Sequence, residues 1–424
     1  MALIDFFKKI EPDKEKSPLL HTAYDAFFTF AFTPNTVTPD GGTHIKDGMD
    51  LKRTMFYVVI ALQLCFLFGT YNIGHQHFLA LGVHESFLAG FHLKLAYGLV
   101  KLLPIFIVAN VVGLGIEFWY ASNRGHGVEE GFLVSGALIP LIMPPDVPLI
   151  WLAFSVAFAV ILGKEAFGGT GMNVWNIALL SRVFIFFAYP TTISGDEVWV
   201  AGLTSTEAGA AVDYTWWQTG FFNGIFEAFG WSTFDPGLTV ADGYTGATPL
   251  ALAANGIPGT DLVGWEAVTS VYSESQMWWG TIPGSIGETC KPFIIVGAIL
   301  LILTKIASWR IMLSMVIGAA LAGMGMNALG LTPFMEVPWQ YHFYMGSFFF
   351  AMAFMATDPV TASGTLTGKW IYGFFIGVIG MIIRVLNPAY PEGWMLAILL
   401  LNTFSATIDN YVLKANIKKR LQRA

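Results

Sequence analysis

The sequence is poor in charged residues and in cysteine. Charged side chains make up 12% of its 424 residues, against about 25% in an ordinary soluble domain. Hydrophobic residues make up 55%. This composition excludes a soluble globular enzyme and predicts an all-α polytopic membrane protein.

The two cysteines, Cys65 and Cys290, have no Cys or His neighbour at metal-ligand spacing. We therefore expect no iron–sulfur cluster or zinc site in this chain. The sequence also lacks a P-loop and a dinucleotide-binding glycine motif. We expect no ATP or NADH site and no nucleic-acid partner, and any redox chemistry would need an organic cofactor.

Basic residues are absent from one long interval. No Lys or Arg lies between Arg182 and Lys291, whereas eleven acids do. Because Lys and Arg collect in cytoplasmic loops, this interval is expected outside the cytoplasm. The bases between the other apolar segments then fall on the opposite side, which predicts that both termini are cytoplasmic.

Ten apolar segments are candidates for membrane-spanning helices, which need about 20 residues each. Their approximate ranges are 54–71, 95–120, 131–143, 149–162, 174–189, 292–306, 311–329, 341–355, 370–385 and 394–412. Five helices on each side of a long loop predict two inverted five-helix repeats. The predicted regions are a cytoplasmic arm at 1–53, a first repeat at 54–190, an external loop region at 191–290, a second repeat at 291–413 and a cytoplasmic tail at 414–424.

Two polar interruptions occupy similar places in the two halves, at 164–176 and 355–370. Broken helices at such positions commonly build the binding site of inverted-repeat membrane proteins. Asn173 and Asn176 would share one face if a helix began there, and their amides suit the edge of a flavin or quinone ring. The alternative is helix capping by Asn173 or Thr170. Asp358, in the second interruption, offers a hard oxygen ligand for a small cation.

Glu117, Asp409, Arg182 and Arg384 lie within expected spans, where charge is costly and usually functional. Glu117 and Asp409 are candidates for a cation path, the alternative being that they reach the membrane interface. Arg182 and Arg384 are candidates for counter-charges or for binding an anionic group.

The external interval contains the stretch DGYTGATPL, from Asp242 to Leu250. Small residues and Pro249 flank Thr248, and such residues favour a turn. We expect Thr248 on an exposed loop, with room for an attached group or a modifying enzyme. The alternative is an ordinary solvated turn.

Nearly the whole chain resembles the B subunits of the sodium-translocating NADH:quinone oxidoreductases of bacterial inner membranes. The motifs that carry the resemblance include KEAFGGTG at 164–171, DGYTGAT at 242–248, TIPGSIGE at 281–288, IASWR at 306–310 and FMATDP at 354–359. The D subunits of Rnf electron-transport complexes are similar, but they generally lack so long an N-terminal arm. A non-redox channel or transporter of the same architecture is a further alternative.

The resemblance implies cofactors and the residues that hold them. Thr248 would carry FMN through a phosphoester bond installed by a separate flavin transferase, and non-covalent riboflavin would bind in the membrane core. The implied riboflavin residues are Asn173, Asn176 and Asp358. The implied quinone residues are Gly113, Glu117 and Phe132. The residues implied on the sodium path are Glu117 and Asp409.

The resemblance also implies partners and a process. The chain would work among membrane lipids as one of six subunits, passing electrons to quinone and coupling that transfer to Na⁺ export. NADH would be oxidised by another subunit. In the family, Pro249 after the acceptor threonine is unusual.

Overall fold

The computed structural model describes residues 9–13, 17–31, 51–124, 131–194, 197–203, 212, 214–240, 244, 246–387 and 393–423. Six helices among these residues are long and apolar enough to cross a membrane. They are α3 (Leu51–Ala80), α4 (Phe91–Arg124), α6 (Leu149–Gly163) extended to Phe167 by η1 (Glu165–Phe167), α13 (Trp309–Leu329), α17 (Leu366–Leu386) and α18 (Trp394–Leu421). The predicted helical membrane protein is confirmed at this level. Most of the predicted arm at 1–53 lies outside the described residues.

Three other predicted spans form shorter apolar helices: α5 (Phe132–Ile142), α7 (Ile177–Ala188) and α12 (Lys291–Leu303). The twelve residues of α7 rise about 18 Å, less than the roughly 30 Å of a hydrocarbon core. The crossing of the membrane by these three segments stays a prediction.

The segment predicted as one span at 341–355 is broken into three pieces. They are α15 (Tyr341–Tyr344), α16 (Phe348–Phe350) and the π-helical η5 (Ala351–Met355). The break contains Gly346, whose φ of 80° lies in the left-handed region that glycine adopts without steric cost. Hydropathy alone did not reveal this interruption.

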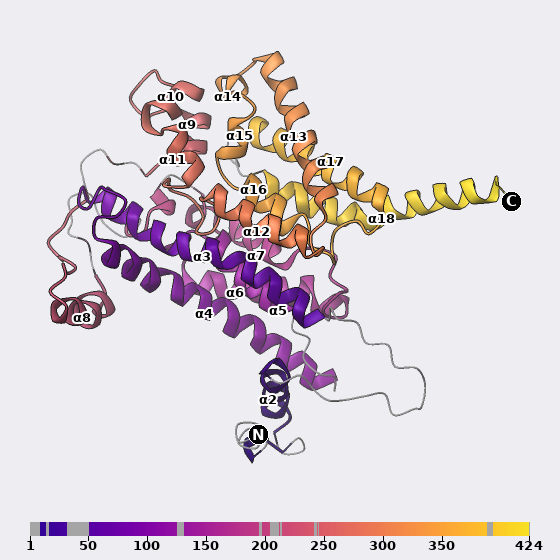
Figure 1. The fold of residues 1–424 in the computed structure, drawn as a ribbon, viewed down its shortest axis with the longest axis horizontal. Helices are drawn as coiled ribbons and strands as arrows, with labels where there is room; N and C mark the ends of the chain where they lie inside the picture. The colour runs from indigo at the N-terminus through magenta and orange to yellow at the C-terminus, as the bar shows by residue number, and fades with distance from the viewer. Residues whose placement is uncertain are drawn as a thin grey trace.

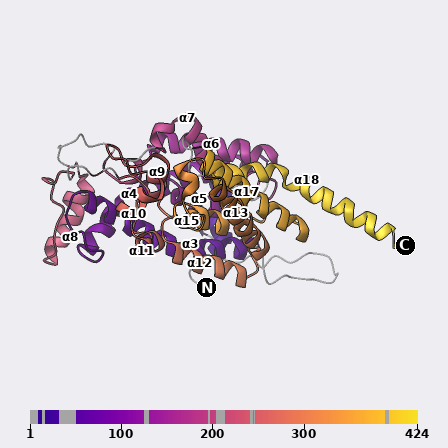
Figure 2. The same cartoon turned by 90° about the horizontal axis from the view of Figure 1, so that it is seen from above.

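Shorter elements connect the long helices. They are α2 (Pro18–Ala31), η1 (Glu165–Phe167), η2 (Pro190–Thr192), η3 (Glu197–Trp199), η4 (Trp217–Phe222), α8 (Asn223–Ala228), α9 (Pro249–Asn255), α10 (Gly264–Val271), α11 (Glu274–Trp279) and α14 (Pro333–Glu336). Figures 1 and 2 show α8 and the C-terminal end of α18 at opposite ends of the molecule.

Glycines allow the long helices to approach closely in both halves. A Cβ at Gly98 would lie 1.7 Å from the Thr70 carbonyl oxygen, on the neighbouring α3. A Cβ at Gly318 of α13 would lie 2.2 Å from the Phe374 carbonyl oxygen of α17. Small residues are the usual means of close helix packing in membranes, so each half is built around a tight helix pair.

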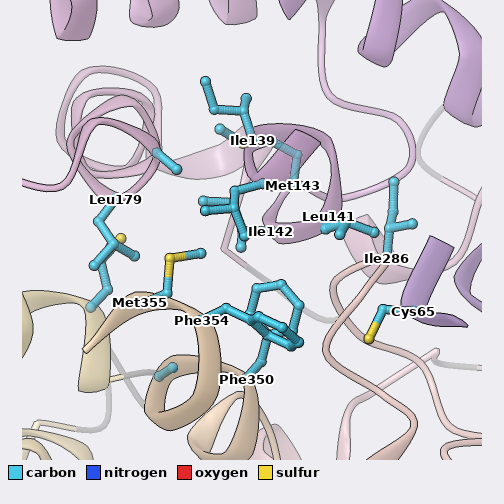
Figure 3. Packing of buried hydrophobic residues seen from close by; sticks show 14 of the residues in the cluster. Cys65, Ile139, Leu141, Ile142, Met143, Leu179, Ile286, Phe350, Phe354 and Met355 are labelled. Atoms are coloured by element: carbon cyan, nitrogen blue, oxygen red, sulfur yellow. The ribbon is translucent and has the colours of Figure 1, made fainter. Parts of the chain in front are cut away.

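One apolar core joins the two halves (Figure 3). Its labelled side chains come from α3, α5, α7, α16, η5 and the segments after α5 and before α12: Cys65, Ile139, Leu141, Ile142, Met143, Leu179, Ile286, Phe350, Phe354 and Met355. Because α7 and η5 share this core, the interrupted segments next to them are held close together.

A second, smaller apolar cluster supports the stretch that contains Thr248. Ala247 and Leu250 pack in it with residues of α10 and α11 and with Phe334, Val337 and Met345. Figure 1 shows α9, α10 and α11 grouped beside α14. The described part of the interval predicted to be external therefore contains packed helices.

Candidate functional site

The two interrupted segments meet at a cavity. Its wall takes residues from 54–58, 131–138, 164–177, 301–307 and 354–360. Asn173, Asn176 and Asp358 all belong to this wall. The structure thus brings together the three residues predicted for riboflavin, from both halves of the chain.

Asn176 connects the two halves directly. Its side-chain amide donates to Asp358 Oδ2 at 3.4 Å, and its side-chain oxygen accepts the Leu179 N–H at 3.2 Å. It is the N-cap of α7, which begins at Ile177. The prediction that a shared helical face aligns Asn173 and Asn176 is therefore wrong. Capping does occur, but through Asn176 rather than Asn173 or Thr170.

The other polar groups in the wall are a mixed set of donors and acceptors. Asn173 donates to the Trp175 carbonyl at 3.1 Å, and Asp358 accepts from the Val360 N–H and the Thr361 hydroxyl, each at 3.1 Å. The buried Thr170 hydroxyl has no partner within the described part of the chain. Buried polar atoms are normally hydrogen-bonded, so this hydroxyl suits a polar ligand, and amides with a carboxylate suit the edge of a flavin ring.

An ion pair connects the wall of the cavity to α4. The Lys164 ammonium donates to the Glu117 carboxylate of α4, and the two residues are 4% and 5% exposed. Glu117 is therefore a buried, charge-paired residue, and its carboxylate does not extend to the surface of the described chain. Next to it, Arg124 and Glu165 form a second ion pair at 3.2 Å.

The residues predicted for quinone lie at the crossing of α4 and α5. A Cβ at Gly113 would lie 1.8 Å from Phe132 Cζ, so the ring of Phe132 packs directly on Gly113. Glu117 follows Gly113 by one helical turn. Gly113, Glu117 and Phe132 are all buried, and they adjoin the cavity without forming part of its wall.

Asp409 of α18 is held by the loop that precedes α17. Its carboxylate accepts hydrogen bonds from four donors: Ser363 Oγ at 2.6 Å, Gly364 N–H at 2.7 Å, Thr365 N–H at 3.1 Å and Thr365 Oγ1 at 2.6 Å. Thr365 also caps α17. Glu117, which pairs with Lys164, therefore has a separate set of partners. In the described ranges, no group of three or more His, Cys, Asp or Glu residues could hold a metal ion.

The two arginines within expected spans have different contacts. Arg182 pairs with Glu288 at 3.3 Å, which confirms the counter-charge interpretation for this arginine. Arg384 donates to the carbonyls of His342 and Met345, on either side of a turn in the broken segment. Nothing in the sequence singles out Glu288, since its partner is 106 positions away.

Thr248 lies at the start of a helix rather than on an open loop. It is half-buried and is the N-cap of α9, where its hydroxyl oxygen accepts the Ala251 N–H at 3.1 Å. Pro249 is the first helical residue, a position where the missing N–H costs nothing. The predicted exposure is therefore only partial.

The rest of the DGYTGAT motif is only partly described. Asp242, Gly243 and Thr245 lie outside the described residues. Gly246 has a φ of 63°, and the Tyr272 hydroxyl donates to the Ala247 carbonyl at 2.7 Å. Burial raises the pKa of Tyr244 to about 12, so its phenol stays neutral at physiological pH.

Comparison with known proteins assigns the family. The family model described as "NQR2, RnfD, RnfE family" matches residues 39–418. The chain belongs to this family.

Its curated relatives in the family are similar over their full length. The B subunit of the Na(+)-translocating NADH-quinone reductase of Chromohalobacter salexigens is 40% identical, over 100% of this chain and 97% of the relative. The proteins of the same name from Pseudomonas paraeruginosa and Klebsiella pneumoniae are 39% and 37% identical, over 100% of both chains in each case. The resemblance seen in the sequence motifs is confirmed.

Proposed function

We propose that this chain is the membrane-embedded B subunit of a sodium-translocating NADH:quinone reductase. The relatives that carry that name match the whole chain. The observation that carries the proposal is the cavity in which Asn173, Asn176 and Asp358 meet. A riboflavin ring in this cavity would lie against amide, carboxylate and hydroxyl groups, which offer both donors and acceptors.

The proposed architecture is ten membrane segments in two inverted repeats. Corresponding helices make corresponding contacts: α4 packs on α6 in the first half, and α13 packs on α17 in the second. The halves also meet through corresponding helices, α3 with α12 and α7 with α18. A two-fold relation between repeats predicts such pairing of equivalent elements.

The proposed external cofactor is FMN, joined to Thr248 by a flavin transferase. A hydroxyl at a helix N-cap is fixed in position by the helix that follows it. The absence of bases from 183–290 favours an external location for this residue. Both termini would then be cytoplasmic, in a bacterial inner membrane.

The proposed electron path divides the membrane into shorter steps. A hydrocarbon core of about 30 Å is too thick for a single transfer. FMN at Thr248 and riboflavin in the cavity would precede a quinone near Gly113, Glu117 and Phe132. Glu117 and Asp409 would serve the sodium path, coupled to electron transfer through a change in conformational free energy. The other subunits would supply NADH oxidation.

An Rnf-type subunit is the second candidate, because the matching family model includes RnfD. The two candidates differ in their electron partners. A purified complex that reduces quinone at the expense of NADH supports the first candidate. Ferredoxin-linked activity without quinone reduction supports the second.

The covalent flavin is tested on a denaturing gel under ultraviolet light, with the chain co-expressed with a flavin transferase. We expect a fluorescent band in the wild type and none in Thr248→Ala, because no hydroxyl remains to be esterified. Thr260→Ala is the matched control, since this exposed threonine lies in the same external region, and its band should persist. A wild-type band without fluorescence, or a fluorescent Thr248→Ala band, would contradict the attachment of FMN to Thr248.

A further inference from the structure

The cavity wall contains two residues that carry full charges. Of the described residues that line it, Lys164 is the only base and Asp358 the only acid. They come from the two different interrupted segments. Asp358 is hydrogen-bonded to neutral groups, whereas the Lys164 ammonium reaches out of the wall to the Glu117 carboxylate.

Glu117 connects this pair to the crossing of α4 and α5. It lies one helical turn from Gly113, on which the Phe132 ring packs. The Glu117–Lys164 ion pair therefore extends from the residues assigned to quinone to the wall assigned to riboflavin. Both members are buried, so solvent screens their charges less than those of a surface pair.

We propose that the Glu117–Lys164 ion pair links the two cofactor sites electrostatically, with Lys164 setting the reduction potential of the flavin in the cavity. This inference rests on the proposed function. An electron added to a bound ring increases its negative charge unless a proton follows. A nearby buried ammonium stabilises that charge, and the Glu117 carboxylate offsets the ammonium. Quinone bound near Glu117 would therefore alter the reduction potential of the flavin. Reduction of the flavin would in turn alter the affinity for quinone.

The charges of the two residues predict shifts of opposite sign. In the purified complex, the non-covalent flavin is titrated with a reductant and followed by its absorbance. Lys164→Gln should make the first electron about tenfold harder to add, a shift of about −59 mV for one electron. Glu117→Gln should shift the potential in the positive direction. Lys164→Arg keeps the charge and should stay near the wild type.

A control variant tests whether the effect is specific to the ion pair that reaches the cavity. Arg124 and Glu165 also tie the end of α4 to the segment after α6, but neither lines the cavity. Arg124→Gln should leave the flavin potential unchanged, and the covalent flavin on Thr248 serves as an internal reference in every variant.

Several outcomes would overturn the link. The first is a flavin potential that shifts in the same direction in Lys164→Gln and Glu117→Gln, and the second is a potential that shifts in neither. The third is a shift in Arg124→Gln as large as that in Lys164→Gln. If Lys164→Gln does not assemble, Lys164→Arg and Glu117→Gln carry the test, and a wild-type potential in the latter overturns it. A wild-type complex without non-covalent flavin overturns the proposed function itself, and the link with it.

Discussion

Glu117 and Asp409 are both acids in long apolar helices, but the protein holds them in different ways. Glu117 is paired with an ammonium 47 positions away in the chain. Asp409 accepts hydrogen bonds from four neutral donors in the single loop 363–365. The positive charge of Lys164 therefore neutralises the negative charge of Glu117. The donors around Asp409 are neutral, so its negative charge is not balanced by them. An acid of the second kind is better suited to attract a cation.

The largest expected effect comes from breaking the ion pair. Glu117→Gln leaves the Lys164 ammonium buried without this carboxylate, which should cost about 3–5 kcal/mol of stability. The measurement is thermal unfolding of the purified protein in detergent. The double replacement Glu117→Gln with Lys164→Met removes both charges and should recover most of the loss. A double variant as unstable as the single one would show that packing, rather than charge, dominates.

A smaller effect is expected at Asp409. Asp409→Asn keeps the size of the side chain but leaves one oxygen to accept from four donors, and its NH₂ group faces donors. We expect a loss of about 1–3 kcal/mol in the same assay. If Asp409 serves the sodium path, quinone reduction by the complex should also need more Na⁺ for half-maximal rate. Asp261→Asn, at an exposed acid in the interval predicted to be external, should change neither quantity. An Asp409→Asn variant with an unchanged Na⁺ requirement would remove Asp409 from the sodium path.

The smallest effect is expected from removing one of the four donors. Ser363→Ala deletes the hydroxyl that donates to Asp409 at 2.6 Å and leaves the other three in place. Thermal unfolding should report a loss of about 1 kcal/mol. A loss as large as that of Glu117→Gln would mean that the loop depends on this hydroxyl alone, and that the two acids do not differ as described.

Patterns within short stretches predicted much of the site. The polar interruptions at 164–176 and 355–370 were visible because glycine and threonine break an apolar run, and their residues do line one cavity. The long apolar helices followed from hydropathy in the same way. Both properties are local, so a single sequence carries them.

Features that depend on distant contacts were not predictable. Nothing near Glu117 identifies Lys164 as its partner, because only the packing of α4 against the segment after α6 brings them together. Which asparagine caps α7 could not be predicted from the sequence, because it depends on where the helix begins. Hydropathy failed at 341–355 because Gly346 and its neighbours are apolar or small enough not to lower it.

The shortness of α7 has an electrical consequence. Its twelve residues span about 18 Å in place of roughly 30 Å, and the segment before it lines the cavity. If α7 crosses the membrane as predicted and the cavity opens to water, the membrane voltage falls across this shorter path, and the local field is roughly 1.7-fold stronger. An ion that crossed there would pass through most of the voltage drop in a single movement past α7. The rate of that movement alone would depend strongly on the membrane voltage.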